Sequence, residues 1–117
     1  MDEKYEAIIC IVNAGFADAV MDVARSCGAR GGTIINARGT AKEETEKMLN
    51  IAIHPEKEIV LILTLNNIKD DILHGLYKEL GLNSAGQGIA FTLPVDEVVG
   101  LNKNIKNFEN SKKESAN

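Results

Sequence analysis

Two glycine-containing turns are the segments of this sequence whose residue types best suit ligand binding. Arg38-Gly39 follows a predicted β-strand, and Gly86-Gln87-Gly88 comes just before another. Glycine adopts backbone angles that other residues avoid, and it lets a ligand approach the main chain closely. Consecutive backbone N–H groups in such a turn can hold a phosphate or another anion. Because most Gly-X-Gly turns are structural, this pattern alone does not assign a site.

Residues that could act as nucleophiles, acid–base catalysts or metal ligands are not grouped in the sequence. His54 stands beside a proline and His74 is expected at the surface of a helix, and neither has a cysteine or carboxylate at metal-ligand spacing. Ser84 lacks the context of a nucleophile elbow. Cys10 and Cys27 lie within apolar patterns, as buried small side chains do. We therefore predict no metal site and no enzymatic activity.

The composition indicates one small acidic domain. The chain has 117 residues, of which 44% are hydrophobic and 4% aromatic, and its formal net charge is −4. The negative charge and the scarcity of aromatic residues argue against binding to nucleic acid. No apolar run approaches the roughly 18 residues that a membrane span needs, and the first residues do not resemble a signal peptide. We expect a cytoplasmic protein without membrane insertion.

Short apolar strands and amphipathic helices follow one another along residues 1–101, and a polar, flexible tail is expected at 102–117. Their order is strand, helix, strand, strand, helix, strand, which predicts an α+β, ferredoxin-like βαββαβ fold with a four-stranded antiparallel sheet and two helices on one face. The second helix has Asn66 and Asn67 as candidate N-caps. A polar, partly helical excursion separates the second and third strands, and a short further element follows the fourth. The predicted strands are 7–12, 33–37, 59–64 and 89–93, and the predicted helices are 16–27 and 66–80.

The first and third strands are apolar at every position, although successive strand residues point to opposite faces of a sheet. A monomer would therefore leave about five Val, Leu or Ile side chains in water, and burying each is worth roughly 1.5–3 kcal/mol. The total of about 10 kcal/mol is comparable to the stability of a whole domain. We predict a homo-oligomer that packs sheet against sheet. Cover by the long excursion or by the tail is the alternative.

Three segments carry a resemblance to a known family. The run Gly-Ala-Arg-Gly-Gly-Thr-Ile-Ile-Asn-Ala-Arg-Gly at 28–39 resembles the second-strand segment of the PII nitrogen-regulatory signalling proteins. The segment 86–91 resembles their nucleotide-contacting B-loop and the strand after it, and 95–99 resembles the segment that follows. The resemblance spans about residues 5–101.

The resemblance implies a homotrimer that binds ATP, ADP or AMP in clefts between subunits and regulates partner proteins in nitrogen metabolism. A long T-loop, here 40–57, would contact the partner, and the bound ligand would change its order. By match, Thr33 would lie near the adenine, and Arg38 and Gly39 at the base of the T-loop. The residues placed around the phosphates are Gly86, Gln87 and Gly88.

The sequence also departs from the family pattern. Ile89 stands where PII proteins usually have a lysine, and Gly100 and Asn102 stand where they have arginines. Those cations neutralise a polyphosphate, and Lys103 or Lys106 could take their place. The T-loop is short and lacks tyrosine. The resemblance therefore predicts a divergent PII-like protein, whose effector is an adenine nucleotide, a cyclic nucleotide or another small anion.

The same fold also carries other functions. An acylphosphatase-like hydrolase needs an arginine in the loop after the first strand, which here reads Asn-Ala-Gly-Phe at 13–16. An RNA-binding module needs exposed aromatic residues on its central strands, and 59–64 has none. A structural or metabolite-binding trimer, like the divalent-ion tolerance proteins, is excluded by no sequence feature and is the main alternative.

Overall fold

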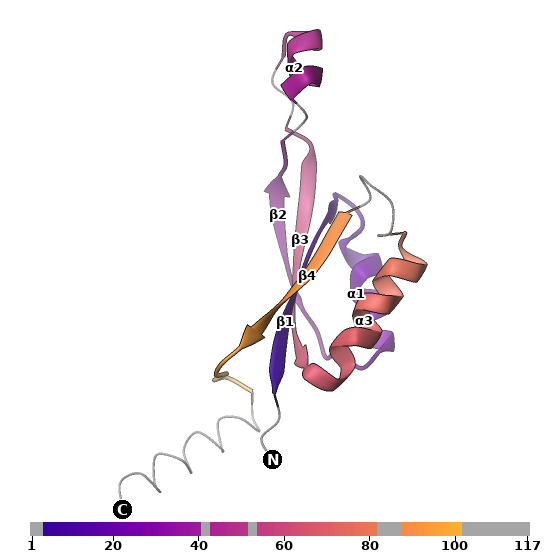
Figure 1. The fold of residues 1–117 in the computed structure, drawn as a ribbon, viewed down its shortest axis with the longest axis vertical. Helices are drawn as coiled ribbons and strands as arrows, with labels where there is room; N and C mark the ends of the chain where they lie inside the picture. Colours follow the sequence, from indigo (N-terminus) through magenta and orange to yellow (C-terminus); the bar gives the residue numbers. More distant parts are fainter. Residues whose placement is uncertain (1–3, 41–42, 52–53, 82–87, 102–117) are drawn as a thin grey trace, which may run out of the picture.

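The computed structural model describes residues 4–40, 43–51, 54–81 and 88–101. Its order of elements confirms the predicted βαββαβ arrangement, with a third, short helix in the excursion between the second and third strands (Figure 1). The elements are β1 (Tyr5–Asn13), α1 (Ala17–Ser26), β2 (Thr33–Arg38), α2 (Glu43–Leu49), β3 (Glu56–Leu65), α3 (Asn66–Glu79) and β4 (Gly88–Val95).

The four strands form one antiparallel sheet in the order β2-β3-β1-β4. The apolar strands β1 and β3 are therefore central, and β2 and β4 are the two edges. Helices α1 and α3 lie together on one face of the sheet (Figure 1). The far ends of β2 and β3 extend beyond the helices as an arm that carries α2 at its tip (Figure 1).

The core lies between the helices and one face of the central strands. Ile8 and Cys10 of β1 and Val60 of β3 are fully buried there. They pack against residues that recur every three or four positions along the helices, such as Val20 of α1 and Ile72 of α3. The alternation of buried and less buried residues along β1 and β3 follows directly from the two-residue period of a strand.

The opposite face of the sheet is apolar and open. The register places Ile9 between Leu61 and Phe91, and Ala7 between Leu63 and Leu93. None of the described segments covers this face. Its larger exposed side chains have 37% to 57% of their surface accessible: Ile35, Leu61, Leu63, Ile89, Phe91 and Leu93. The excess of apolar side chains predicted from the sequence is thus confirmed for the single chain.

Two local predictions about the helices were wrong. Phe16, the first residue of the predicted helix 16–27, precedes the first helical turn as the N-cap of α1 and is 53% exposed. Neither Asn66 nor Asn67 caps α3. Strand β3 runs straight into this helix, so Leu65 takes the N-cap position, and the N–H of Asn66 donates to the carbonyl oxygen of Lys4 at 2.8 Å.

The ends of two strands also differ from the prediction. β4 does not stop before Pro94 but continues to Val95. Proline is tolerated there because β4 is an edge strand and pairs only with β1. β3 begins at Glu56, so the last two residues of the predicted T-loop belong to the strand. Residues 96–101 contain neither helix nor strand, contrary to the predicted further element. The predicted tail, 102–117, lies outside the described residues.

Candidate functional site

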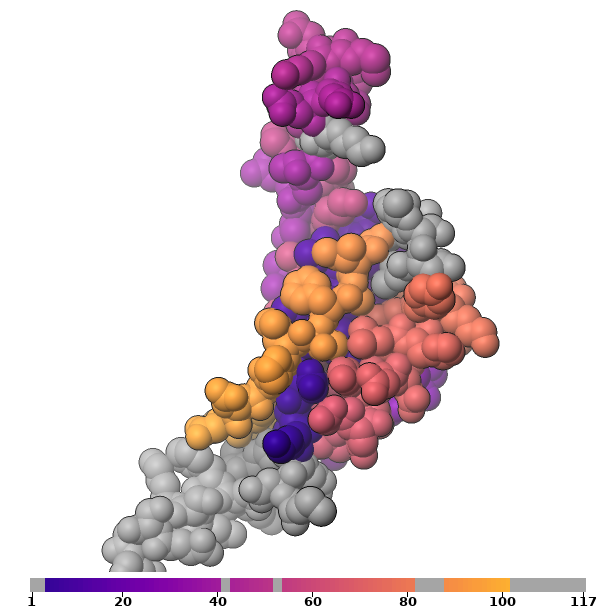
Figure 2. All heavy atoms as spheres, in the orientation of Figure 1, coloured from indigo at the N-terminus to yellow at the C-terminus, as the bar shows by residue number. Residues whose placement is uncertain are grey.

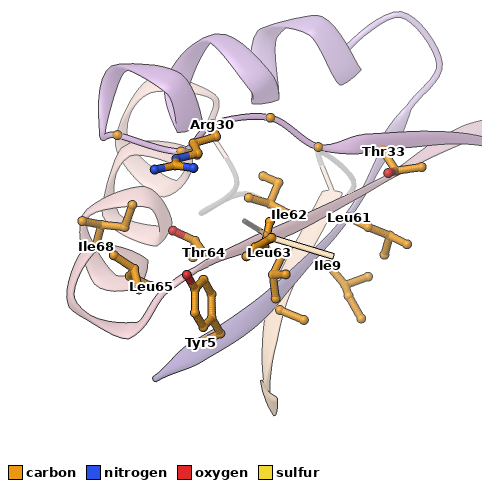
Figure 3. Close-up of a pocket in the computed structure, with 16 residues that line it drawn as sticks. Tyr5, Ile9, Arg30, Thr33, Leu61, Ile62, Leu63, Thr64, Leu65 and Ile68 are labelled. Carbon is orange, nitrogen blue, oxygen red and sulfur yellow. The ribbon is translucent and has the colours of Figure 1, made fainter. Parts of the chain in front are cut away.

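A pocket of about 700 Å³ lies at the place where β2 begins beside β3 (Figure 3). One wall is the connection between α1 and β2, residues 28–32, and the first residue of β2, Thr33. The other walls come from the second half of β3 and from β1. Described lining residues include Tyr5, Ile9, Arg30, Thr33, Leu61, Leu63, Thr64 and Ile68.

The pocket exists because β2 is shorter than its neighbour. β2 pairs with β3 only as far as Leu61, and β3 continues to Leu65. At this end Gly32 passes so close to β3 that a Cβ there would lie 2.9 Å from the carbonyl oxygen of Leu61 and 2.8 Å from Met21 Sδ. Any larger residue would push the connection off the sheet.

The close approach at Gly32 also indicates the direction of the backbone N–H and C=O groups along this edge of β3. The carbonyl group of Leu61 is directed toward β2, and backbone groups two residues apart on a strand point the same way. The N–H and C=O of Leu63 are therefore directed past the end of β2, toward the pocket. This edge offers one hydrogen-bond donor and one acceptor beside an apolar floor.

The two ends of the pocket differ in chemistry. Ile9 and Leu61 lie toward the Thr33 end, whereas Arg30, Thr64 and Tyr5 lie at the opposite end (Figure 3). An apolar floor with a few polar groups is typical of a small-molecule site. Sequence reasoning did not single out Arg30 or Thr64. An arginine among glycines in the run at 28–32 could have indicated the first, but only the fold brings the second beside it.

The predicted residues of β2 are distributed over two places. Thr33 lines the pocket. Arg38 stands at the other end of the same strand, about 17 Å away for five residues at roughly 3.3 Å each. There Arg38 lines a smaller pocket of about 450 Å³ together with Asn36, Glu56 and Lys57. Gly39 follows directly, and its N–H donates to the carbonyl oxygen of Pro55 at 2.8 Å.

The predicted residues near β4 are not brought to β2 within one chain. Gly88 begins β4 opposite Val12, with a φ of 144° that favours glycine. β4 and β2 are opposite edges of the sheet, three strand spacings or about 14 Å apart. Gly86 and Gln87 lie outside the described residues.

The loop after β1 donates hydrogen bonds to the side-chain carboxylate of Glu58 in β3. Glu58 Oε1 accepts hydrogen bonds from the N–H of Gly15 at 2.6 Å and the N–H of Ala17 at 3.3 Å. These donors at the start of α1 are the groups that a phosphate cradle in this loop would use. Their engagement by Glu58 argues against an acylphosphatase-like site, in agreement with the absence of an arginine at 13–16.

The remaining reactive side chains form no cluster in the described part of the chain. His54 and His74 are both exposed. No group of three or more His, Cys, Asp or Glu residues able to hold a metal occurs among the described residues. Burial raises the pKa of the Cys10 thiol to about 11, which keeps it in the unreactive neutral form. No described helix is long and apolar enough to cross a membrane.

Comparisons with known proteins give structural matches only. No family model and no curated protein sequence matches this chain. CPII from Thiomonas intermedia, a nitrogen regulatory PII-like protein bound to ADP, AMP and bicarbonate, superimposes with a TM-score of 0.63 at 12% identity, covering 84% of this chain and 97% of its own.

A second similar structure comes from a plant. Arabidopsis thaliana PII bound to citrate superimposes with a TM-score of 0.65 at 20% identity, covering 88% of this chain and 85% of its own. The resemblance first seen in the glycine segments is thus confirmed at the level of structure, and this chain has the fold of PII and PII-like proteins.

Proposed function

We propose that this protein is a divergent PII-like regulator that binds a nucleotide at the seams of a homotrimer. Binding would be communicated to partner proteins through the arm between β2 and β3. The observation that carries the proposal is the pocket beside Thr33, at an edge of a sheet whose open face is apolar. A role in nitrogen metabolism follows from the resemblance alone.

The distances within one chain support a site made by two. Thr33, Arg38 and Gly39 lie at the β2 edge, and Gly88 begins strand β4 at the other edge. Because β3 and β1 lie between these two edges, one ligand can contact both sets only if β4 of a neighbouring subunit lies beside β2. The open apolar face supplies a reason for subunits to associate in the first place. Association and ligand binding are therefore linked in this proposal.

The proteins of similar structure suggest the class of effector. One is bound to ADP, AMP and bicarbonate, and the other to citrate. ATP, ADP and AMP are therefore the first ligands to test, and the base would enter the pocket beside Thr33. The phosphates would extend along β2 toward Arg38 and Gly39.

The tip of the arm suits contact with a protein partner. Met48, Leu49 and Ile51 expose 79%, 52% and 58% of their surface, and the tip stands away from the helices and the sheet (Figures 1 and 2). The C-terminal end of α2 is closed by a backbone hydrogen bond. Asn50 adopts a left-handed φ of 55°, and the N–H of Ile51 donates to the carbonyl oxygen of Glu46 at 3.2 Å. The exposed apolar side chains are thus presented in a defined geometry.

A structural trimer without an effector is the second candidate. Ile89 occupies the position where PII proteins usually have a lysine, and it is 57% exposed on the open apolar face. At this position the chain offers contact area for another subunit instead of a cation for a phosphate.

Thermal unfolding in the presence of ATP, ADP and AMP separates these two candidates. A ligand that binds the native state at 100 times its Kd raises the free energy of unfolding by about 2.7 kcal/mol. We expect at least one of these nucleotides to raise Tm, and no rise with any of them would favour the structural trimer.

A variant that fills the pocket makes this test specific. Gly31 lines the pocket and has open space around the position of a Cβ, so Gly31→Phe should occupy the pocket without disturbing the fold. The Tm rise should disappear in this variant and persist in Lys78→Phe, which places the same ring on the exposed side of α3. Loss of the rise in both variants would contradict binding in this pocket.

A further inference from the structure

Arg30 stands out among the residues around the pocket. Of the described lining residues it alone carries a charge, and no salt bridge within the described part of the chain involves it. A guanidinium group has five hydrogen-bond donors and no acceptor. Arg30 is exposed to solvent, so its guanidinium is free to donate to an acceptor atom of a ligand that enters this end of the pocket.

Thr64 provides an independent observation at the same end. Its side chain is only 3% exposed, and its hydroxyl oxygen has no hydrogen-bond partner among the described residues. Buried polar groups in folded proteins nearly always have a partner. In Figure 3 the hydroxyl of Thr64 lies on the same side as the guanidinium of Arg30, at the end of the pocket away from Thr33. A ligand group that reaches this end of the pocket would supply the missing partner.

The orientation of a bound nucleotide follows from the direction of β2. This strand leads from Thr33 away from the pocket toward Arg38 and Gly39, the direction in which the proposed function extends the phosphates. The base then enters with its far edge toward Arg30 and Thr64. This step rests on the proposed function.

The polar groups at this end differ in whether they can donate a hydrogen bond, accept one, or do both. The backbone of Leu63 offers a donor and an acceptor, and the hydroxyl of Thr64 can act as either. These two groups fit an adenine or a 6-oxopurine equally well. Arg30 can only donate. Where it faces position 6 of the base, it fits the carbonyl oxygen of guanine or hypoxanthine and opposes the amino group of adenine, whose acceptors are its ring nitrogens.

We propose that Arg30 and Thr64 determine base selection in this pocket and favour 6-oxopurine nucleotides over adenine nucleotides. The preference is the reverse of the adenine expected from the resemblance. A hydrogen bond to a charged group is worth enough to change an affinity by about tenfold or more. We therefore expect GDP and IDP to bind at least about tenfold more tightly than ADP.

Calorimetric titration of the full chain with GDP, IDP and ADP tests the preference. In Arg30→Gln the ratio of the ADP and GDP Kd values should fall toward one, because an amide can present either a donor or an acceptor. Arg25→Gln is the matched control, since Arg25 is exposed in the last turn of α1 and does not line the pocket. This control should keep the ratio of the parent protein.

Thr64→Val tests the hydroxyl separately. Valine has nearly the same shape, so this variant should bind GDP several-fold more weakly while the ligand-free protein remains at least as stable to denaturant. A clear loss of stability without ligand would show that the hydroxyl serves the fold, and would overturn its assigned role.

The outcomes distinguish this inference from the proposed function. If ADP binds as tightly as GDP or more tightly, the base preference is overturned while nucleotide binding stands. An equal weakening of ADP and GDP in Arg30→Gln would likewise overturn selection by Arg30. If none of the three nucleotides binds, both the inference and the proposed function fail.

Discussion

At the scale of single residues, Cys10 shows how strongly the core excludes water. Its side chain is fully buried under the helices, and burial raises the pKa of its thiol from 9.0 to about 11. Desolvation disfavours the thiolate, so the folded chain keeps the proton at pH values where the unfolded chain releases it.

This difference predicts a loss of stability at alkaline pH. Because the folded pKa is the higher one, the contribution of Cys10 is complete below pH 9 and is lost as the pH rises to about 11. The free energy of unfolding should fall by about 3 kcal/mol over this range, at about 1.4 kcal/mol per pKa unit. Denaturant titrations of the parent protein and of Cys10→Ala would measure the decrease. An equal decrease in both proteins would contradict the assignment to Cys10.

At the scale of elements, α1 depends on a residue far away in the sequence. Its N-cap, Phe16, has no side chain able to accept a hydrogen bond, and Glu58 of β3 accepts from Gly15 and Ala17 instead. The carboxylate also lies at the positive end of the helix dipole. One side chain thus joins the start of α1 to the sheet.

Removal of this carboxylate should weaken the whole domain. A lost N-cap costs about 0.5–2 kcal/mol, so Glu58→Ala should lower the denaturation midpoint correspondingly. Glu56→Ala is the matched control, because Glu56 is exposed on the same strand and contributes its backbone carbonyl, not its side chain, to Ala14. The two variants can be compared by urea denaturation, and equal effects would count against the capping role.

At the scale of the whole molecule, the open apolar face of the sheet is the reason we propose that the protein forms an oligomer. Apolar side chains lie on this face in all four strands, whereas a soluble monomer rarely exposes such a large continuous patch. Contact between copies of this face would bury side chains that contribute roughly 1.5–3 kcal/mol each when fully covered.

A single charge on this face should separate the subunits. Phe91 lies on the open face beside Ile9 and is 42% exposed, so Phe91→Glu would place a carboxylate in the proposed interface. We expect a trimer for the parent protein and a monomer for the variant by light scattering. Tyr77→Glu, on the exposed surface of α3, should remain a trimer. A monomeric parent protein would remove the basis for the shared site.

The sequence by itself determined the order of elements and the apolar character of both sheet faces. Both properties are local. Residues close in sequence show the period of two in a strand and the period of about 3.6 in a helix. The strands at 7–12 and 59–64 and the glycine segments that resemble PII proteins are therefore evident in the sequence alone. The exposure of Phe16 and the cap of α3 are not, since they depend on where one element meets the next.

Only the tertiary structure decided which residues share the pocket and which cannot meet. Arg30 and Thr64 are 34 positions apart in the printed numbering, and they line one pocket because β2 stops pairing at Leu61 while β3 continues. Conversely, Thr33 in β2 and Gly88 in β4 lie on opposite edge strands of the sheet, because β3 and β1 stand between them. Strand order and strand length arise from packing across the whole chain, so no short stretch of sequence contains them.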